Sequence, residues 1–196
     1  MYGGDLPSDW RKGKERMAET RWVSLVGMMG AGKSAIGQSL AHRLGLRSID
    51  SDVEIETAAA MTIPEIFDRF GEDFFREKES LVLERLLGGP PGVLSTGGGA
   101  VLSATNRALL RDHSIMVWLD CDLETLWQRV RQKTDRPLLL VEDPKGTLAT
   151  LIEARAPLYA EADVRVYTGG STTVPQIVDD IITALPFGPA HDRSGS

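Results

Sequence analysis

The sequence predicts an α/β fold with a doubly wound parallel sheet of five strands. Five short apolar runs alternate with segments of helical periodicity between residues 22 and 185. The first run, at 22–26, leads directly into GMMGAGKS at 27–34, which fits the pattern G-x-x-x-x-G-K-S. In such a fold ligands bind above the carboxyl ends of the strands, so we expect the functional residues to gather there.

Composition limits the possible function classes. The chain has 196 residues, 42% of them hydrophobic and 26% charged, which suits one domain with a substantial core. A net charge of −6 argues against general nucleic-acid binding, although it leaves room for a local basic pocket. Cys121 is the only cysteine, which excludes an intramolecular disulfide and favours a reducing compartment.

The ends of the chain carry no recognisable chemistry. Residues 1–20 and 187–196 are polar and aperiodic, so we expect flexible extensions around a single domain at 21–186. The chain lacks the run of roughly 18 apolar residues that a membrane span needs, and its start lacks the apolar stretch of a signal peptide. We therefore expect a cytoplasmic protein with neither a membrane nor a nucleic acid as partner.

The segment at 27–34 is the strongest indication of function. Its glycines let the backbone curl so that successive N–H groups face phosphate oxygens, and the helix that follows adds its positive end. Lys33 would reach the β- and γ-phosphates, and the Ser34 hydroxyl would ligate Mg²⁺. The alternative is a tight glycine turn with a surface lysine, which leaves the Lys-Ser pair unexplained. The segment therefore predicts a nucleotide site.

Two carboxylates follow the second predicted strand. Gly45 is expected to end the helix that begins at Ser34, and residues 46–49 then form the strand. Asp50 and Asp52 come directly after it, where parallel sheets build ligand sites. Asp52 alone also suits the N-cap of a helix at 53–60, and both interpretations can hold together.

Two helices are predicted between this helix and the third strand. Thr62-Ile63-Pro64-Glu65 is a capping box that starts a short helix, and Gly71 separates it from a longer helix at 72–87. Arg76 lies near the start of the longer helix among acidic residues. From the residues alone, a solvated salt-bridge face is the favoured interpretation of Arg76.

The third and fourth strands end in contrasting ways. The strand at 93–96 leads into Gly97-Gly98-Gly99, which predicts a close approach by a ligand rather than a mobile turn. The strand at 115–120 is the most apolar and ends in Asp120, as a metal-binding Walker B strand would. Asp120 and Asp122 also suit caps of the next helix, at 123–131, which weakens that metal role.

The last third of the chain contains a candidate lid. Residues 132–147 are polar and rich in turn residues, and their basic side chains suit a lid over phosphates. A helix at 148–156 is expected to stop at Pro157, with Arg155 placed to complement the helix dipole. A strand at 163–166 and a helix at 174–185 complete the alternation.

Six of these segments together resemble the shikimate kinase family. They are GMMGAGKS at 27–34, DSD at 50–52, FFRE at 74–77, STGGG at 95–99, RPL at 136–138 and RAPLY at 155–159. Only the first is specific by itself, but their order and spacing match from about residue 22 to 185. The resemblance implies a small P-loop kinase with strand order 2-3-1-4-5 and a mobile lid. It also implies transfer of the γ-phosphoryl group of ATP to the 3-hydroxyl of shikimate with Mg²⁺, in aromatic amino acid biosynthesis.

The resemblance further implies roles for individual residues. The shikimate contacts would be Asp52, Arg76, Gly98 and Arg155. The nucleotide would contact Gly30, Ala31, Gly32, Lys33, Ser34, Ala35, Arg129 beside the adenine, and Arg136 from the lid. Asp50 would hold Mg²⁺ through water beside Ser34. Lys33, Asp52 and Arg136 would be catalytic. The strand that ends in three glycines takes the Walker B place, which leaves Asp120 without a metal role.

The chemistry of these residue types agrees with such roles. Arginine offers a planar pair of donors to a substrate carboxylate, and Asp52 could accept the proton of a hydroxyl nucleophile. Two alternatives stay open at this stage: another small hydroxy-acid kinase of the same fold, such as gluconate kinase, and a nucleotide-dependent switch or binding module. A monomer is the expected assembly.

Overall fold

The structure is a computed structural model that describes residues 21–131 and 141–186. The two expected extensions lie outside this range. So does the part of the expected lid at 132–140, which includes Arg136.

Five parallel strands form one sheet in the order β2-β3-β1-β4-β5, as the family resemblance implied. The strands are β1 (Trp22–Val26), β2 (Ser48–Asp50), β3 (Val93–Ser95), β4 (Ser114–Asp120) and β5 (Val164–Tyr167). Central β1 pairs with β3 through Val23 and Val93 and with β4 through Val23 and Ile115. All five β1 residues are buried, because helices cover both faces of a parallel sheet.

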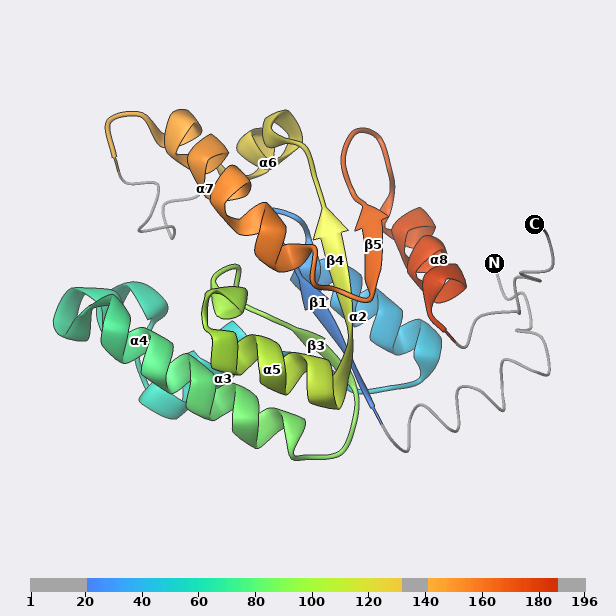
Figure 1. Cartoon of the computed structure of the whole chain (residues 1–196), viewed down its shortest axis with the longest axis horizontal. Helices are drawn as coiled ribbons and strands as arrows, with labels where there is room; N and C mark the ends of the chain where they lie inside the picture. The colour runs from blue at the N-terminus through green and yellow to red at the C-terminus, as the bar shows by residue number, and fades with distance from the viewer. Residues whose placement is uncertain (1–20, 132–140, 187–196) are drawn as a thin grey trace.

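Helices cover the sheet on both sides (Figure 1). α2 (Lys33–Leu44) and α8 (Val174–Ala184) pack on one face. The other face carries α5 (Ala104–His113), which packs against α4 (Ile63–Leu87), and α4 contacts α3 (Ser51–Ala59). α6 (Leu123–Val130) and α7 (Pro144–Tyr159) contact each other, and α7 also contacts the short 3₁₀ turn η1 (Ala100–Leu102).

Most predicted elements lie within a few residues of their expected bounds, and several local predictions are confirmed. Gly45 ends α2 in the left-handed conformation at φ 62°. Thr62 and Glu65 form the expected capping box, and Gly71 interrupts α4 with φ 80° and ψ 175°. Asp122 caps α6, whereas Asp120 instead pairs with Arg165 at 2.7 Å.

The start of α3 differs from the prediction. The second strand runs to Asp50, and Asp50 rather than Asp52 is the N-cap, accepting a hydrogen bond from the Asp52 N–H at 3.0 Å. Asp52 therefore lies in the first helical turn. Its carboxylate lies close to Gly97, just beyond the end of β3.

The prediction for α7 is wrong at both ends. Asp143 caps the helix and Pro144 occupies its first turn, so residues 144–147 belong to α7 and not to a loop. Pro157 does not stop the helix, which continues to Tyr159. A proline this close to a helix end removes only one intrahelical hydrogen bond near a terminus that is already partly unpaired.

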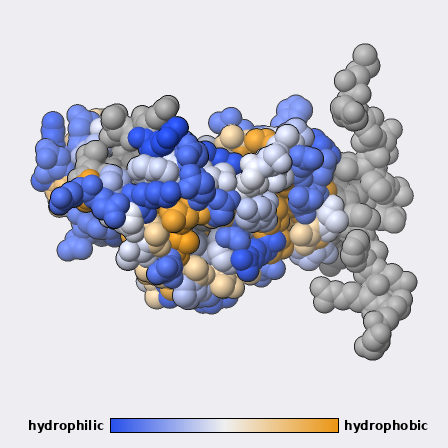
Figure 2. Space-filling model, turned by 90° about the horizontal axis from the view of Figure 1, so that it is seen from above, coloured by the Kyte–Doolittle hydropathy of each residue, from blue (hydrophilic) through white to orange (hydrophobic). Residues whose placement is uncertain are grey.

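The face seen in Figure 2 is mostly hydrophilic, and its apolar residues form small separate patches among the described part of the surface. Within residues 21–131 and 141–186, the structure holds no helix that is both long and apolar enough to cross a membrane.

Candidate active site

The phosphate-type loop lies between β1 and α2, as expected. Gly27, Gly30 and Gly32 adopt φ values of 144°, 82° and 92°, which only glycine tolerates easily. The Lys33 ammonium donates hydrogen bonds to the carbonyl oxygens of Gly27 at 2.8 Å and Met28 at 2.9 Å. The lysine thus folds back over the loop, with its charge next to the backbone that would surround a phosphate.

Ser34 and Asp50 bring the loop and the end of β2 together. The Ser34 hydroxyl donates to Asp50 Oδ2 at 2.6 Å. Hydroxyl and carboxylate oxygens suit Mg²⁺, which usually keeps several waters and takes only one or two protein carboxylates. The described residues hold no group of three or more His, Cys, Asp or Glu side chains placed for a metal. The donor set therefore fits a magnesium ion shared with phosphate and water oxygens.

Two cavities meet at this point. A cavity of about 430 Å³ follows the loop and includes Lys33, Ala35 and Arg129 in its lining. A second cavity, of about 280 Å³, opens between α3, α4 and the end of β3. Both are lined by Met29, Ser34, Asp50, Asp52 and Gly98. A group bound in one cavity can therefore reach a group bound in the other.

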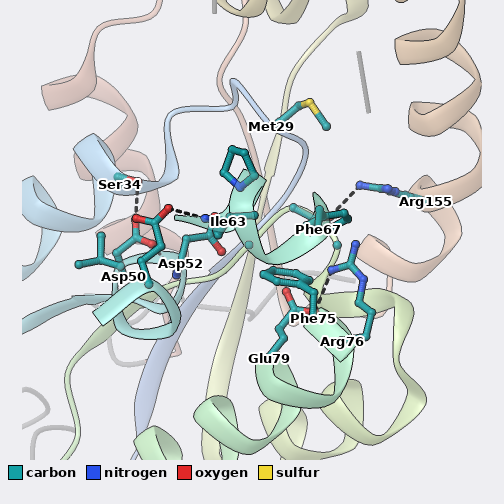
Figure 3. A pocket seen from close by; sticks show the side chains of 16 residues that line it. Met29, Ser34, Asp50, Asp52, Ile63, Phe67, Phe75, Arg76, Glu79 and Arg155 are labelled. Atoms are coloured by element: carbon teal, nitrogen blue, oxygen red, sulfur yellow. Dashed lines mark hydrogen bonds and ion pairs between the residues drawn. The ribbon is translucent and has the colours of Figure 1, made fainter. Parts of the chain in front are cut away.

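The second cavity has two carboxylates at one end and two guanidinium groups at the other, where Glu79 also lies beside Arg76 (Figure 3). Asp50 and Asp52 lie on one side, and the guanidinium groups of Arg76 and Arg155 lie on the other. Its apolar wall is formed by Ile63, Pro64, Phe67 and Phe75. The arrangement suits a small molecule with an anionic group at one end, a hydroxyl at the other and an apolar ring face between them.

The three glycines after β3 include two that side chains of the protein itself approach closely, whereas the prediction named a ligand. A Cβ on Gly97 would lie 2.6 Å from Asp52 Oδ1 and 3.0 Å from Glu79 Oε1. A Cβ on Gly99 would collide with the Arg76 guanidinium. Any larger residue at 97 or 99 would therefore displace the charged groups that line the cavity.

Arg76 forms salt bridges within its own helix, as the interpretation favoured from the residues alone required, but the solvated face in that interpretation is wrong. Its guanidinium lines the cavity and pairs with Glu79 at 2.9 Å and with Glu72 at 2.9 Å. Burial lowers the pKa of Arg76, but the two carboxylates more than offset this and hold it above the usual value.

Glu79 was missed as a site residue. Its side chain is 1% exposed, and burial raises its pKa above the ordinary range against the opposing charge of Arg76. One sequence signal could have found it: Glu79 shares a helical stripe with the buried residues Val82, Leu83 and Leu86, where an acidic residue is unusual.

Arg155 is buried rather than placed at a helix end. It is 4% exposed, and its Nη1 donates to the Gly98 carbonyl oxygen at 3.2 Å. Tyr159, one turn further along α7, donates to the same oxygen at 2.6 Å. Burial raises the pKa of Tyr159 to about 12, so its hydroxyl keeps its proton at neutral pH.

Arg129 joins two loops at the far end of the first cavity. Its guanidinium donates to the Gly30 carbonyl at 3.2 Å and to the Thr168 carbonyl at 3.1 Å. The predicted site residues that the structure describes line the two cavities, except Ala31, which is buried within the loop, and Arg136 lies outside the described part of the chain.

Comparisons with known proteins agree with this geometry. A sequence model described as shikimate kinase matches residues 29–186. A shikimate kinase from Ruegeria pomeroyi is 58% identical over 163 residues, which are 83% of this chain and 84% of that protein. The structure of a shikimate kinase from Acinetobacter baumannii in complex with shikimate has a TM-score of 0.82 at 38% identity, covering 87% of this chain and 95% of the other.

A gluconokinase structure from Sinorhizobium meliloti is also similar, with a TM-score of 0.57 at 19% identity, covering 85% of this chain and 91% of that one. At this identity the likeness concerns the fold alone.

Proposed function

The chain belongs to the shikimate kinase family, and we propose that it transfers the γ-phosphoryl group of ATP to the 3-hydroxyl of shikimate. The product is shikimate 3-phosphate, and the reaction is a step of aromatic amino acid (chorismate) biosynthesis. The observation that carries the proposal is the pair of joined cavities, one along the phosphate loop and one with opposite charges at its two ends.

The buried Arg155 supports an anionic substrate. A buried guanidinium is costly unless its charge is balanced, and within 21–131 and 141–186 Arg155 forms no salt bridge, although it interacts electrostatically with the buried Glu79. A substrate carboxylate would supply the missing charge. Arg76 would form the other half of the carboxylate clamp, with Glu79 and Glu72 holding its guanidinium in place.

The other end of the cavity would hold the reacting hydroxyl. Asp52 lies where the two cavities meet, so it would accept the hydroxyl proton as the oxygen attacks the γ-phosphorus. Lys33 would leave the Gly27 and Met28 carbonyls to neutralise charge on the phosphates. Ser34 and Asp50 would hold Mg²⁺, which supplies charge neutralisation on the β- and γ-phosphate oxygens when bound.

The proposal also assigns roles to Arg129, Gly98 and Arg136. Arg129 would flank the adenine, and the Gly98 N–H would contact shikimate. Arg136 would act from a lid, where such an arginine can contribute roughly 10³–10⁵ in rate. Because residues 144–147 belong to α7, the proposed lid is confined to about 132–143. A monomer in the cytoplasm remains our prediction.

A coupled assay of ADP release tests the proposal. With ATP and Mg²⁺, we expect turnover with shikimate and little with gluconate, nucleoside monophosphates or shikimate whose carboxylate has been reduced to an alcohol. The Arg155→Ala variant should lose most of the preference for shikimate over the alcohol, since losing one partner of a buried charge pair costs about 2–5 kcal/mol. Nucleotide binding without ADP release with any hydroxy-acid would instead support a binding module.

A further inference from the structure

The Gly98 carbonyl oxygen has two donors from the same helix. Tyr159 donates its hydroxyl at 2.6 Å and Arg155 donates Nη1 at 3.2 Å, and both residues are buried. A carbonyl oxygen has two lone pairs and can accept both. The Tyr159 contact lies at the short end of the range for O–H···O hydrogen bonds, whereas the Arg155 contact lies at the long end of the range for N–H···O bonds. The Tyr159 hydroxyl is thus well placed to hold this oxygen by itself.

Tyr159 is itself held in place by its surroundings. Its ring stacks on Trp118 of β4 with centroids 6.0 Å apart, and its hydroxyl lies 3.5 Å from the Met28 sulfur in the phosphate loop. Because the side chain is 2% exposed and its hydroxyl keeps its proton, it offers a fixed neutral donor. Arg155, by contrast, lines the cavity and would be drawn towards a bound anion.

We propose that Tyr159 is a positioning residue for substrate binding. It keeps the Gly98 carbonyl hydrogen-bonded when Arg155 turns from that oxygen to the substrate carboxylate. Without Tyr159, binding of the carboxylate would leave a buried carbonyl unpaired, or Arg155 would be divided between two acceptors. The inference rests on the proposed function, since it takes the carboxylate of shikimate as the group that draws Arg155 away.

The test measures binding and turnover of Tyr159→Phe with shikimate and with its carboxylate-reduced alcohol. With shikimate, the dissociation constant and the KM should rise roughly three- to tenfold, the range for one lost neutral hydrogen bond, while kcat and the KM for ATP stay within about twofold. With the alcohol, the dissociation constant should stay within about twofold, because Arg155 has no reason to leave Gly98.

Tyr167→Phe is the matched control. Tyr167 is exposed and donates to Asp122 on the surface at 2.9 Å, so both ligands should bind this variant as they bind the wild type. The ratio of the two dissociation constants, measured on one preparation, does not depend on the folded fraction of that preparation. A destabilised Tyr159→Phe sample therefore still gives an answer.

Each outcome has a distinct meaning. Equal losses for both ligands in Tyr159→Phe would assign Tyr159 a packing role only and overturn the inference. An unchanged affinity of Tyr159→Phe for shikimate would also overturn the inference. Failure of the wild type to turn over shikimate would overturn the proposed function, irrespective of how Tyr159→Phe behaves.

Discussion

Replacing Arg76 by alanine should expose the cost of the buried Glu79 carboxylate. Glu79 is 1% exposed, its Oε2 accepts from Arg76 at 2.9 Å, and its Oε1 has no hydrogen-bond partner among the described residues. Removing one partner of such a pair costs about 3–5 kcal/mol of stability. Arg76 itself is only about one-fifth exposed, so solvent screens the pair weakly.

Protonation of Glu79 limits this cost and makes it depend on pH. Burial already raises the pKa of Glu79, and loss of Arg76 should raise it further. A carboxyl whose pKa is higher in the folded state loses stability as pH rises from its unfolded value towards its folded value. Neutralising a glutamate of unfolded pKa about 4.3 costs about 4 kcal/mol at pH 7 but only about 1 kcal/mol at pH 5.

Urea unfolding without ligands, at pH 5 and pH 7, measures this difference. The deficit of Arg76→Ala relative to wild type should be near 3 kcal/mol at pH 7, equivalent to about 6–12 °C in Tm, and should shrink to about 1 kcal/mol at pH 5. Adding Glu79→Met should restore most of the stability at pH 7, because the buried charge is gone.

Glu72→Gln serves as the control, because Glu72 is the outer, half-exposed partner of Arg76 and its loss should cost less than about 1 kcal/mol at either pH. A deficit in Arg76→Ala that is the same at both pH values would refute the reasoning. The reasoning would also be refuted if adding Glu79→Met to Arg76→Ala restored none of the lost free energy of unfolding at pH 7.

Three further changes address the reaction and the fold. Lys33→Ala should abolish ADP release with ATP and shikimate while leaving the circular dichroism spectrum unchanged, and near wild-type turnover would rule out the loop assignment. Asp52→Asn should lower kcat far more than it weakens shikimate binding, because an amide keeps the hydrogen bond but is a poor proton acceptor; a purely KM effect would contradict that role. Asp122, whose pKa is lowered to about 2 chiefly by the hydrogen bond from the Thr125 N–H, should stabilise α6 above its ordinary pKa and progressively lose this effect as pH falls towards 2. Asp122→Ala should therefore cost about 1 kcal/mol at pH 7 and almost nothing near pH 2, as thermal melts at both pH values can show.

The sequence by itself determined the elements whose causes are local. The phosphate loop, the capping box at Thr62, the left-handed Gly45 and the break at Gly71 each depend on one or a few neighbouring residues. All of them are found where the pattern predicted them. Strand order and the set of site residues came from the family resemblance, since spacing alone does not say which strands become neighbours.

The tertiary structure decided matters that depend on contacts between distant segments. The start of α7 is not one of these matters, because the Asp143 cap and Pro144 in the first turn are local signals, and the prediction of a lid up to residue 147 missed them. In the sequence, Arg76 suits a salt-bridge face and Arg155 suits a helix end, whereas in the structure both lie against the glycines that follow β3. Glu79 differs from any solvated glutamate only in being enclosed.

The physical reason is that burial and electrostatics are properties of the folded surroundings. A charge pattern within one helix shows which groups can pair, but not which side of the helix is desolvated. Desolvation raises the pKa of Glu79 and makes the buried charge of Arg155 costly unless an anion binds beside it. The same packing brings two donors, Arg155 and Tyr159, to the Gly98 carbonyl oxygen. These effects arise only when α4, α7 and the three glycines after β3 meet at the carboxyl end of one sheet.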